Sequence, residues 1–168
     1  MFKSLLNYYK LKKKYKNVVF GGKGYFEFIE NIQFLGYAYV GPDAFWSAKG
    51  KIIIGNNVII GPKSILWTYS HNYNSNSFIP YGPPDEDLIG DIVIEENVWM
   101  GLGATILPNV TIGEGAIIGM KAVVTKNVPP LAVVVGNPGK IVKYRDRKKY
   151  LELKKEGKLY LAYKMENF

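Results

Sequence analysis

The hydrophobic positions of this chain recur every six residues over much of its length. Between Ile94 and Pro129 each block of six opens with an aliphatic residue or Met, and its fifth place holds Val or Ala. The opening residues are Ile94, Met100, Ile106, Ile112, Ile118 and Val124, and the fifth-place residues are Val98, Ala104, Val110, Ala116, Ala122 and Val128. A period of six fits neither the 3.6 residues of a helical turn nor the alternation of a strand. It is typical of a left-handed parallel β-helix, in which each hexapeptide forms one side of a triangular coil.

The pattern therefore predicts an all-β solenoid. We expect the opening residues to fill the triangular prism and the small fifth-place residues to lie beside them. Glycines near the corners are expected to supply φ values that other residues avoid. The same rhythm is clean over residues 54–70, and over 26–53 it is present with slipped spacing. The openings are Ile54, Ile60 and Leu66 in the clean stretch, and Ile29, Leu35 and Val40 in the irregular one.

The ends of the chain lack the repeat, so we predict one domain in three parts. Residues 1–28 would form an N-terminal cap segment, 29–138 the β-helix and 139–168 a basic C-terminal tail. Residues 2–16 are predicted to be an amphipathic helix that covers one end of the prism. Its apolar face would consist of Phe2, Leu5, Leu6 and Tyr9. A second, basic helix is predicted over 144–165, with apolar positions at Tyr150, Leu151, Leu153, Leu159 and Leu161.

The rhythm fails between residues 71 and 91, in the segment that begins HNYNSNSFIPYGPPDEDLIG. The next opening residue, Ile94, lies 28 positions after Leu66, which is not a multiple of six. A segment so rich in Asn, Ser, Pro and Gly predicts a loop extruded from a corner of the prism. Long loops inserted into a rigid repeat are usually functional.

Composition narrows the chemistry that the loop can carry. The chain has no Cys and one His among 168 residues, so disulfides, thiolate catalysis and a metal site are not expected. The beginning of the chain does not resemble a secretory signal and no stretch is long and apolar enough to span a bilayer, which makes the cytoplasm the expected compartment.

Charge is distributed unevenly along the chain, whose net charge is +8. Residues 1–25 carry seven Lys and no acid, 26–139 carry five Lys and ten acids, and 140–168 carry ten Lys or Arg and four acids. A nucleic-acid-binding protein would show a basic face on the folded body. Basic ends suit anionic small molecules or the inner surface of a membrane, or they are simply solvated tails.

The single histidine, His71, stands where the last regular coil meets the loop. An imidazole can take a proton from a hydroxyl or an amine near neutral pH, so His71 is the candidate general base. Its second ring nitrogen needs a partner, which would be a backbone carbonyl or a carboxylate. The candidate carboxylates are Asp43, Asp85, Asp87 and Asp91.

The surroundings of His71 combine aromatic and amide side chains, which suits the binding of sugar rings. The candidate acceptor-binding residues are Trp67, Tyr69, Asn72, Tyr73, Tyr81 and Asp87, with Phe78, Asn74 and Asn76 nearby. The alternative is that the aromatic residues pack the loop onto its own prism.

The stretch NVWMGLGATILPNVTIGEGAIIGMKAVVTKNVPPLAVVVGNPGKIV, residues 97–142, resembles the C-terminal signature of the hexapeptide-repeat acyltransferases. The resemblance covers about 54–143 and is greatest to the small sugar O-acetyltransferases of cell-surface polysaccharide pathways. It implies an acetyl-CoA-dependent acyl transfer in a homotrimer, with each site between neighbouring prisms. We expect direct attack by the acceptor hydroxyl, without a metal.

The resemblance also implies which residues bind coenzyme A. They are Gly101 and Leu102 at the thioester, Gly119 and Met120 along the pantetheine, Thr125 and Lys126 near the adenosine, and Lys140 and Lys143 at the phosphates. Met120 departs from the Gly-Ala pair that is common in the family. A backbone N–H in the region 101–103 would stabilise the oxyanion.

Two other functions fit the same sequence. An N-acetyltransferase acting on a nucleotide-linked amino sugar or a small amine would need the same histidine and the same cofactor groove. A solenoid that serves only as an assembly module would need neither, and it predicts no affinity for acetyl-CoA.

Overall fold

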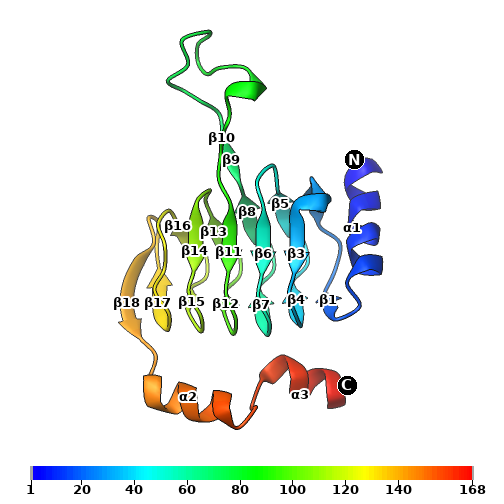
Figure 1. Cartoon of the computed structure of the whole chain (residues 1–168), viewed down its shortest axis with the longest axis vertical. Helices are drawn as coiled ribbons and strands as arrows, with labels where there is room; N and C mark the ends of the chain where they lie inside the picture. Colours follow the sequence, from blue (N-terminus) through cyan, green and yellow to red (C-terminus); the bar gives the residue numbers. More distant parts are fainter. Residues whose placement is uncertain (1, 168) are drawn as a thin grey trace.

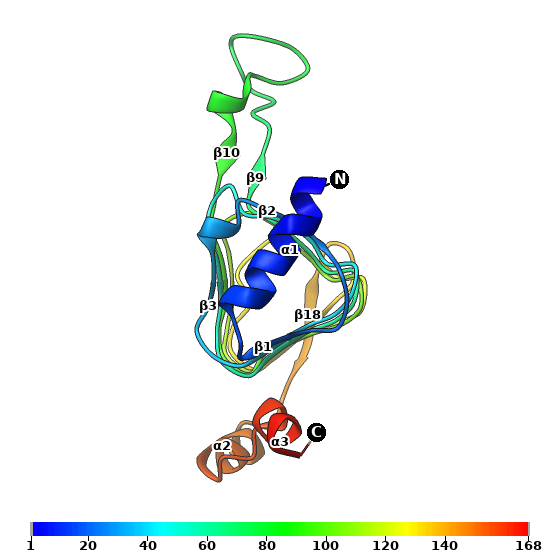
Figure 2. The ribbon, with the colours of Figure 1, turned by 90° about the vertical axis from the view of Figure 1, so that its right-hand side faces the viewer.

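The computed structural model describes the backbone of residues 2–167 and the side chains of residues 5–164, and it forms a parallel β-solenoid of about six turns (Figure 1). Viewed along its axis the solenoid is a triangular prism with one sheet on each side (Figure 2). The fold is the predicted left-handed parallel β-helix.

Three sheets form the sides of the prism, and the strands of each sheet are named below in their spatial order. The seven-stranded sheet contains β1 (Val18–Phe20), β4 (Ala38–Val40), β7 (Val58–Ile60), β12 (Trp99–Met100), β15 (Ile117–Ile118), β17 (Ala132–Val135) and β18 (Lys140–Tyr144). The five-stranded sheet contains β16 (Val123–Val124), β13 (Thr105–Ile106), β8 (Ile65–Trp67), β5 (Phe45–Ser47) and β2 (Tyr25–Glu27). The four-stranded sheet contains β14 (Val110–Ile112), β11 (Ile92–Ile94), β6 (Ile52–Ile54) and β3 (Ile32–Phe34).

The three corners of the prism differ in what they carry (Figure 2). The loop corner, between the five- and four-stranded sheets, extrudes the segment that holds His71. The helix corner, between the four- and seven-stranded sheets, is covered by α2 (Arg147–Lys155) and α3 (Tyr160–Asn167). The open corner, between the seven- and five-stranded sheets, carries no additional element among the described residues.

The predicted inward positions are confirmed throughout the clean repeat. Ile54, Ile60 and Leu66 are fully buried, and every opening residue from Ile94 to Val124 is at most 2% exposed. The fifth-place residues are buried beside them. Successive turns are in register, because Thr105 pairs with Val123, 18 residues later.

The β-helix begins at Val18, earlier than the predicted start at residue 29. Val18 pairs with Ala38 and Ile32 pairs with Ile52, so the first turns contain 20 residues each. Two extra residues per turn break the six-residue phase, which is why these turns looked irregular in the sequence. Leu35, predicted as an opening residue, is 60% exposed. Aromatic residues fill the prism in these turns: Phe20, Phe26, Phe34 and Trp46.

Corner glycines serve mainly for close packing, which corrects the expectation that they supply unusual φ. At the corners of the coils positive φ falls on Gly103 and Gly115 but otherwise on side-chain-bearing residues such as Asp43, Asn57 and Lys121. Gly61 and Gly101 have ordinary φ values. A Cβ atom at Gly61 would lie 2.7 Å from the carbonyl carbon of Gly101 in the next coil, and one at Gly101 would lie 2.7 Å from the amide nitrogen of Met120.

The N-terminal helix α1 (Phe2–Lys14) covers the end of the prism, but with a different face from the predicted one. Tyr8 and Leu11 are its buried hydrophobic residues, and Leu6 and Tyr9 are more than half exposed. Leu5 is also exposed, and the predicted contribution of the Phe2 side chain falls outside the described side chains.

The C-terminal segment forms two helices instead of the single predicted helix over 144–165. Tyr144 still belongs to β18, and α2 begins after Asp146, whose side chain accepts a hydrogen bond of 3.0 Å from the Lys149 N–H. Gly157, with φ of 67°, separates α2 from α3. Tyr150 and Leu161 pack against the body, whereas Leu151 is 49% exposed.

We predict that inward and outward isoleucines differ sharply in their contribution to stability. Ile94→Ala should lower the free energy of unfolding by about 2–5 kcal/mol, because it leaves a cavity in a fully packed prism. Ile79→Ala is the matched control, since Ile79 is 95% exposed in the loop, and it should change that free energy by less than about 0.5 kcal/mol. Urea unfolding measures both, and similar losses would contradict the assignment of the core.

Candidate active site

The extruded loop is attached to the loop corner by a short antiparallel ladder. β9 (Tyr69–Ser70) pairs with β10 (Leu88–Ile89), and the 3₁₀ turn Pro84–Glu86 precedes β10. Buried Thr68 fixes the base: its hydroxyl donates to the Ser47 carbonyl at 3.0 Å and accepts from the Gly50 N–H at 2.9 Å. These bonds hold the start of the loop to the preceding coil, so the residues that follow have a defined position.

His71 is held by a carboxylate on the returning arm of the loop. Its Nδ1 lies 2.8 Å from Oδ1 of Asp87, and the Asp87 side chain is only 3% exposed. Lys49, from the coil below, donates to the other carboxylate oxygen at 2.8 Å and to the Pro84 carbonyl at 2.8 Å. Among the four carboxylates considered from the sequence, the structure thus places Asp87 on the imidazole.

The pKa of Asp87 lies below its ordinary value of 3.8, first because of the hydrogen bond from Lys49 and then because of the one with His71. The ionised carboxylate accepts from an Nδ1–H, which leaves Nε2 as the basic nitrogen of the neutral ring. Nε2 makes no hydrogen bond within the described part of the chain, and the His71 side chain is 47% exposed. The ring is therefore oriented as a general base would need.

Aromatic rings fix the plane of the imidazole. Tyr81 stacks on His71 with ring centroids 4.1 Å apart and an angle of 8° between the planes. Tyr69 meets the imidazole edge-on at 5.9 Å. Burial raises the pKa of Tyr69, with further contributions from nearby Glu27 and Asp87, so its hydroxyl stays protonated.

Trp67 lies in a row of stacked rings on the outside of the five-stranded sheet. Phe45 stacks on Tyr25 at 4.6 Å, because the two residues are register partners in neighbouring coils. Phe45 also stacks on Trp67 at 5.4 Å, two positions beyond its own partner Ile65 in the next coil. One face of the Trp67 ring is thus covered by Phe45. Beside this row Glu27 accepts hydrogen bonds from Ser47, at 2.9 Å, and from Tyr25, whose pKa it raises to about 12.

Sequence reasoning missed Lys49, Glu27, Tyr25 and Phe45 as neighbours of the site. Tyr25 and Phe45 are 20 residues apart, and that spacing of aromatic residues was the available signal. Of the other candidate acceptor residues, Tyr73 is 72% exposed on the loop, and Asn72 accepts a hydrogen bond from the Asn74 N–H at 3.0 Å within a turn.

The other three candidate carboxylates lie elsewhere. Asp43 is at the open corner with φ of 59°, Asp85 is exposed in the 3₁₀ turn, and Asp91 accepts from the Lys51 N–H at 2.8 Å.

The open corner carries part of the predicted cofactor site. Gly101–Leu102 and Gly119–Met120 occupy this corner in consecutive coils, and Leu102 and Met120 are 37% and 66% exposed. The amide N–H groups of Gly101 and Gly119 donate to the neighbouring coils at 2.7 Å. Those of Leu102 and Met120 have no hydrogen-bond partner among the described residues. The corner thus presents two amide donors one coil apart.

The remaining predicted cofactor residues divide between two places. Lys140 pairs with Val135 on β17, next to the open corner, and Lys143 lies on the same edge strand. Thr125 and Lys126 follow β16 and are exposed at the loop corner. In a single chain, therefore, the open corner and the loop corner are two different edges of the prism, and no one cleft gathers all the predicted residues.

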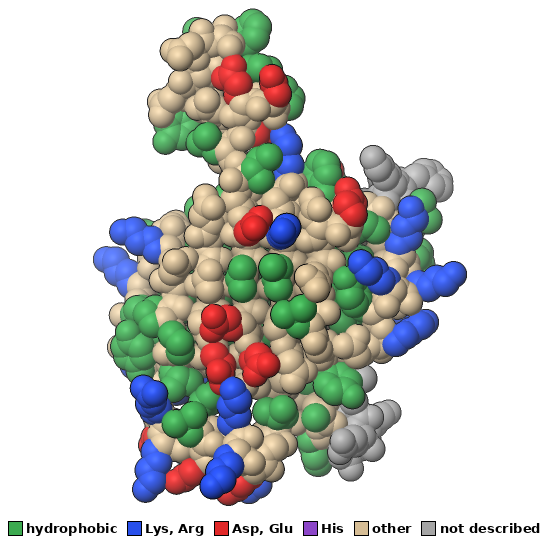
Figure 3. Space-filling view, viewed as in Figure 1, with side chains coloured by type: hydrophobic (Ala, Val, Ile, Leu, Met, Phe, Trp, Pro, Cys, Tyr) green, Lys and Arg blue, Asp and Glu red, His purple; other side chains and the backbone are tan. Residues whose placement is uncertain are grey.

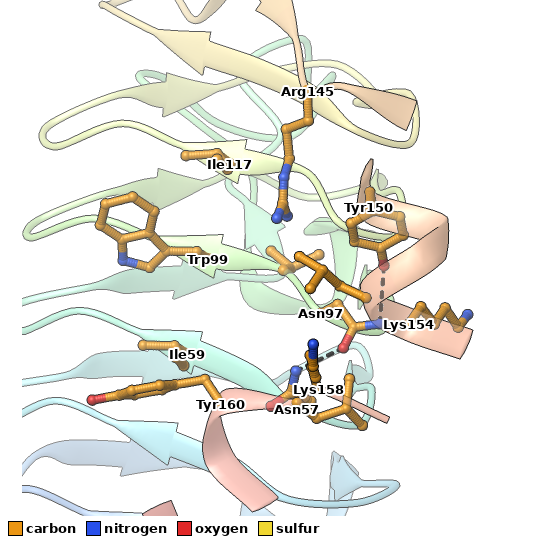
Figure 4. A pocket seen from close by; sticks show the side chains of 13 residues that line it. Asn57, Ile59, Asn97, Trp99, Ile117, Arg145, Tyr150, Lys154, Lys158 and Tyr160 are labelled. Atoms are coloured by element: carbon orange, nitrogen blue, oxygen red, sulfur yellow. Dashed lines mark hydrogen bonds between the residues drawn. The ribbon is translucent and has the colours of Figure 1, made fainter. Parts of the chain in front are cut away.

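A cavity of about 270 Å³ lies under the C-terminal helices, at the helix corner (Figure 4). Ile59, Trp99 and Ile117 form its apolar wall, and Tyr150 lies across it. Hydrogen bonds hold the Tyr150 hydroxyl, which donates to Glu114 at 2.7 Å and accepts from Asn97 at 2.9 Å. None of the predicted site residues lines the cavity. The hydrogen bonds of Tyr150 connect α2 to the prism here.

Among the described residues, no helix is long and apolar enough to cross a membrane. The same residues contain no group of three or more His, Asp or Glu side chains placed to hold a metal ion.

Residues 91–126 match the family described as bacterial transferase hexapeptide (six repeats). The repeat over these residues is thus of the hexapeptide transferase type. It is 46% identical over 95 residues to the "Putative acetyltransferase" of Schizosaccharomyces pombe, covering 55% of this chain and 42% of that protein. It is 36% identical over 109 residues to the "Putative colanic acid biosynthesis acetyltransferase" of Escherichia coli, covering 65% and 56%. The chain thus spans about half the length of these two relatives.

Among solved structures, the chain resembles a hexapeptide-repeat acetyltransferase from Vibrio cholerae that was crystallised with acetyl coenzyme A. The TM-score is 0.67 at 29% identity, and the match covers 82% of this chain and 76% of that one.

We predict that Lys49 controls the ionisation of Asp87. Lys49→Met should raise the pKa of Asp87 towards 3.8, since it removes the largest cause of the lowered value. A carboxylate whose pKa is lowered by folding stabilises the fold above its ordinary pKa, and this contribution disappears as the pH falls through the lowered value. In the variant this contribution should be smaller, and its loss should be complete at a higher pH. ¹³C NMR titration of the Asp87 carboxyl measures the change.

The control is Lys51→Met, on the same coil, which removes an equal charge from an exposed side chain. If the Asp87 carboxyl titrates at the same pH in the Lys49 variant as in the unaltered chain, the Lys49–Asp87 contact does not govern the ionisation of Asp87.

Proposed function

We propose that this chain is an acetyl-CoA-dependent O-acetyltransferase that acts on a sugar hydroxyl of a cell-surface glycan or its precursor. The observation that carries the proposal is the His71–Asp87 pair, which leaves Nε2 of a half-exposed imidazole without a hydrogen-bond partner among the described residues. The naming of the Escherichia coli relative after colanic acid biosynthesis supports the glycan as acceptor.

In this mechanism His71 takes the proton of the acceptor hydroxyl at Nε2 as the oxygen attacks. Asp87 fixes the Nδ1–H tautomer and stabilises the imidazolium, and Lys49 holds Asp87 ionised. When bound, acetyl-CoA would supply a thioester carbonyl as the acyl donor, with its thiolate as the leaving group. The proton that His71 takes up at Nε2 would then pass to this thiolate. Tyr81 keeps the ring plane constant through both transfers.

The open corner has the properties needed for the acyl donor. The unpaired N–H of Leu102 is a suitable donor for the negative charge that develops on the carbonyl oxygen, and that of Met120 suits an amide of the pantetheine. Of the region 101–103 considered from the sequence, Leu102 is favoured because the N–H groups of Gly101 and Gly103 are already bonded within the fold. Lys140, beyond Met120, offers a positive charge for phosphate.

The complete site is proposed to form between neighbouring chains of a homotrimer. His71 and the Leu102 amide lie on different corners of one prism, so a second chain must bring its open corner to the loop corner of the first. Three such contacts close into a ring, in which each loop corner meets the open corner of a neighbouring chain. Tyr73 and Asn72, on the loop, would then contact the acceptor beside His71.

We predict that His71→Ala lowers kcat by at least about 10²-fold while acetyl-CoA still binds, because only the general base is lost. Coenzyme A release with a panel of sugars measures the rate, and the thermal shift with acetyl-CoA measures binding. His71→Ala with near-normal turnover would refute the base. No thermal shift in the unaltered chain would favour a non-catalytic module, and acetylation of amino sugars at nitrogen in place of hydroxyls would identify the N-acetyltransferase.

We also predict complementation between two inactive variants. His71→Ala removes the base, and Met120→Glu, at an exposed position, places a negative charge along the path of the donor. If one chain supplies the base and its neighbour the corner, mixed trimers refolded from equal amounts should recover about a quarter of normal activity. A site built within a single chain predicts no recovery, and mixing each variant with itself is the control.

A further inference from the structure

The outward face of α1 carries apolar side chains between lysines. At 100° per residue, the face opposite Tyr8 and Leu11 contains Leu6, Tyr9 and Lys13, with Lys10 beside them. Leu6 is 54% exposed and Tyr9 is 52% exposed. The helix is thus apolar on two sides, and only one of them is used by the fold.

The helix lies flat across the end of the prism, so its outward face forms the end surface of the molecule (Figure 2). Asn7 donates to the Phe26 carbonyl at 2.8 Å, and the Tyr15 hydroxyl donates to the Ile32 carbonyl at 2.8 Å. The Tyr8 ring packs edge-on against Phe20 at 5.8 Å. These contacts fix which face points outward.

The charge of this end surface is positive. Figure 3 shows Lys side chains gathered over α1, on the right of the molecule. The exposed lysines of the helix and its continuation are Lys10, Lys12, Lys13, Lys14 and Lys16. Residues 1–25 contain no Asp or Glu, so no acidic side chain of this segment neutralises them.

We propose that α1 docks the protein end-on to an anionic lipid bilayer. Leu6 and Tyr9 would enter the headgroup region, where an apolar helix edge and a phenol ring are both favourable. The lysines on either side would extend their charged ends to lipid phosphates while their methylene chains cover the apolar edge. The apolar centre of the patch distinguishes this surface from one that binds the phosphates of nucleic acid, which needs positive charge alone.

Assembly strengthens the interaction. In the proposed homotrimer, with its axis along the prisms, three α1 helices would face the same side and bind one surface together. This step rests on the proposed function, whereas the docking of a single helix does not.

Co-sedimentation of the full chain with lipid vesicles tests the proposal. We expect binding to phosphatidylcholine vesicles that contain 30 mol% phosphatidylglycerol and weak binding to pure phosphatidylcholine. The double variant Lys10→Gln, Lys13→Gln should bind the anionic vesicles roughly 25-fold more weakly, at about fivefold per lysine. Leu6→Ser should weaken binding about fivefold, because the apolar edge no longer enters the interface.

The matched control is Lys148→Gln, Lys155→Gln, which removes two exposed lysines from α2. It should bind as the unaltered chain does, and so should His71→Ala, whose defect lies in catalysis. Equal losses in the α1 and α2 double variants would overturn the proposal, as would binding that does not respond to Leu6→Ser or to phosphatidylglycerol. A preference for a DNA duplex over anionic vesicles would identify the surface as a nucleic-acid site instead.

Discussion

The ladder of backbone hydrogen bonds between equivalent positions of successive coils constrains every other feature of this molecule. Gly61 donates to the Met100 carbonyl at 2.8 Å and Gly101 donates to the Ile118 carbonyl at 2.7 Å. Each coil must therefore present its strands at the same three places, and like side chains stack on like. This stacking produces the filled prism, the outer row of aromatic rings and the tight glycine corners. Any extra residue has to leave the coil at a corner.

The extra residues leave at one corner only. From Phe26 to Phe34 and from Trp46 to Ile54 the inward positions are 8 apart, and from Leu66 to Ile94 they are 28 apart. From Ile106 to Ile112, across the same corner, they are 6 apart. The loop corner is thus the variable edge of the prism, and it carries the imidazole. The open corner keeps constant geometry and presents the amides, which suits a site that needs a movable acceptor pocket and a rigid donor groove.

The sequence predicted what the repeat itself determines and failed where contacts between distant residues decide. The opening residues from Ile54 onward follow from the six-residue period, and all are buried. The turns of 20 residues escaped because two extra residues shift the phase. The buried face of α1 could not be read from amphipathicity, since both faces are apolar. Lys49 and Asp87 are 38 residues apart, and only the coil geometry brings them together.

End-on docking would give the position of the loop along the axis a functional meaning. The loop leaves the prism after β8, two coils from β2 in the first turn, and neighbouring strands lie about 4.8 Å apart. His71 would then stand only about 10 Å beyond the first coil, with α1 between that coil and the bilayer. A sugar acceptor on a lipid anchor would have to extend across the thickness of α1 and this distance. An end-on orientation would therefore hold the base within reach of a membrane-bound glycan, whereas a side-on orientation would press the loop or the C-terminal helices against the lipid.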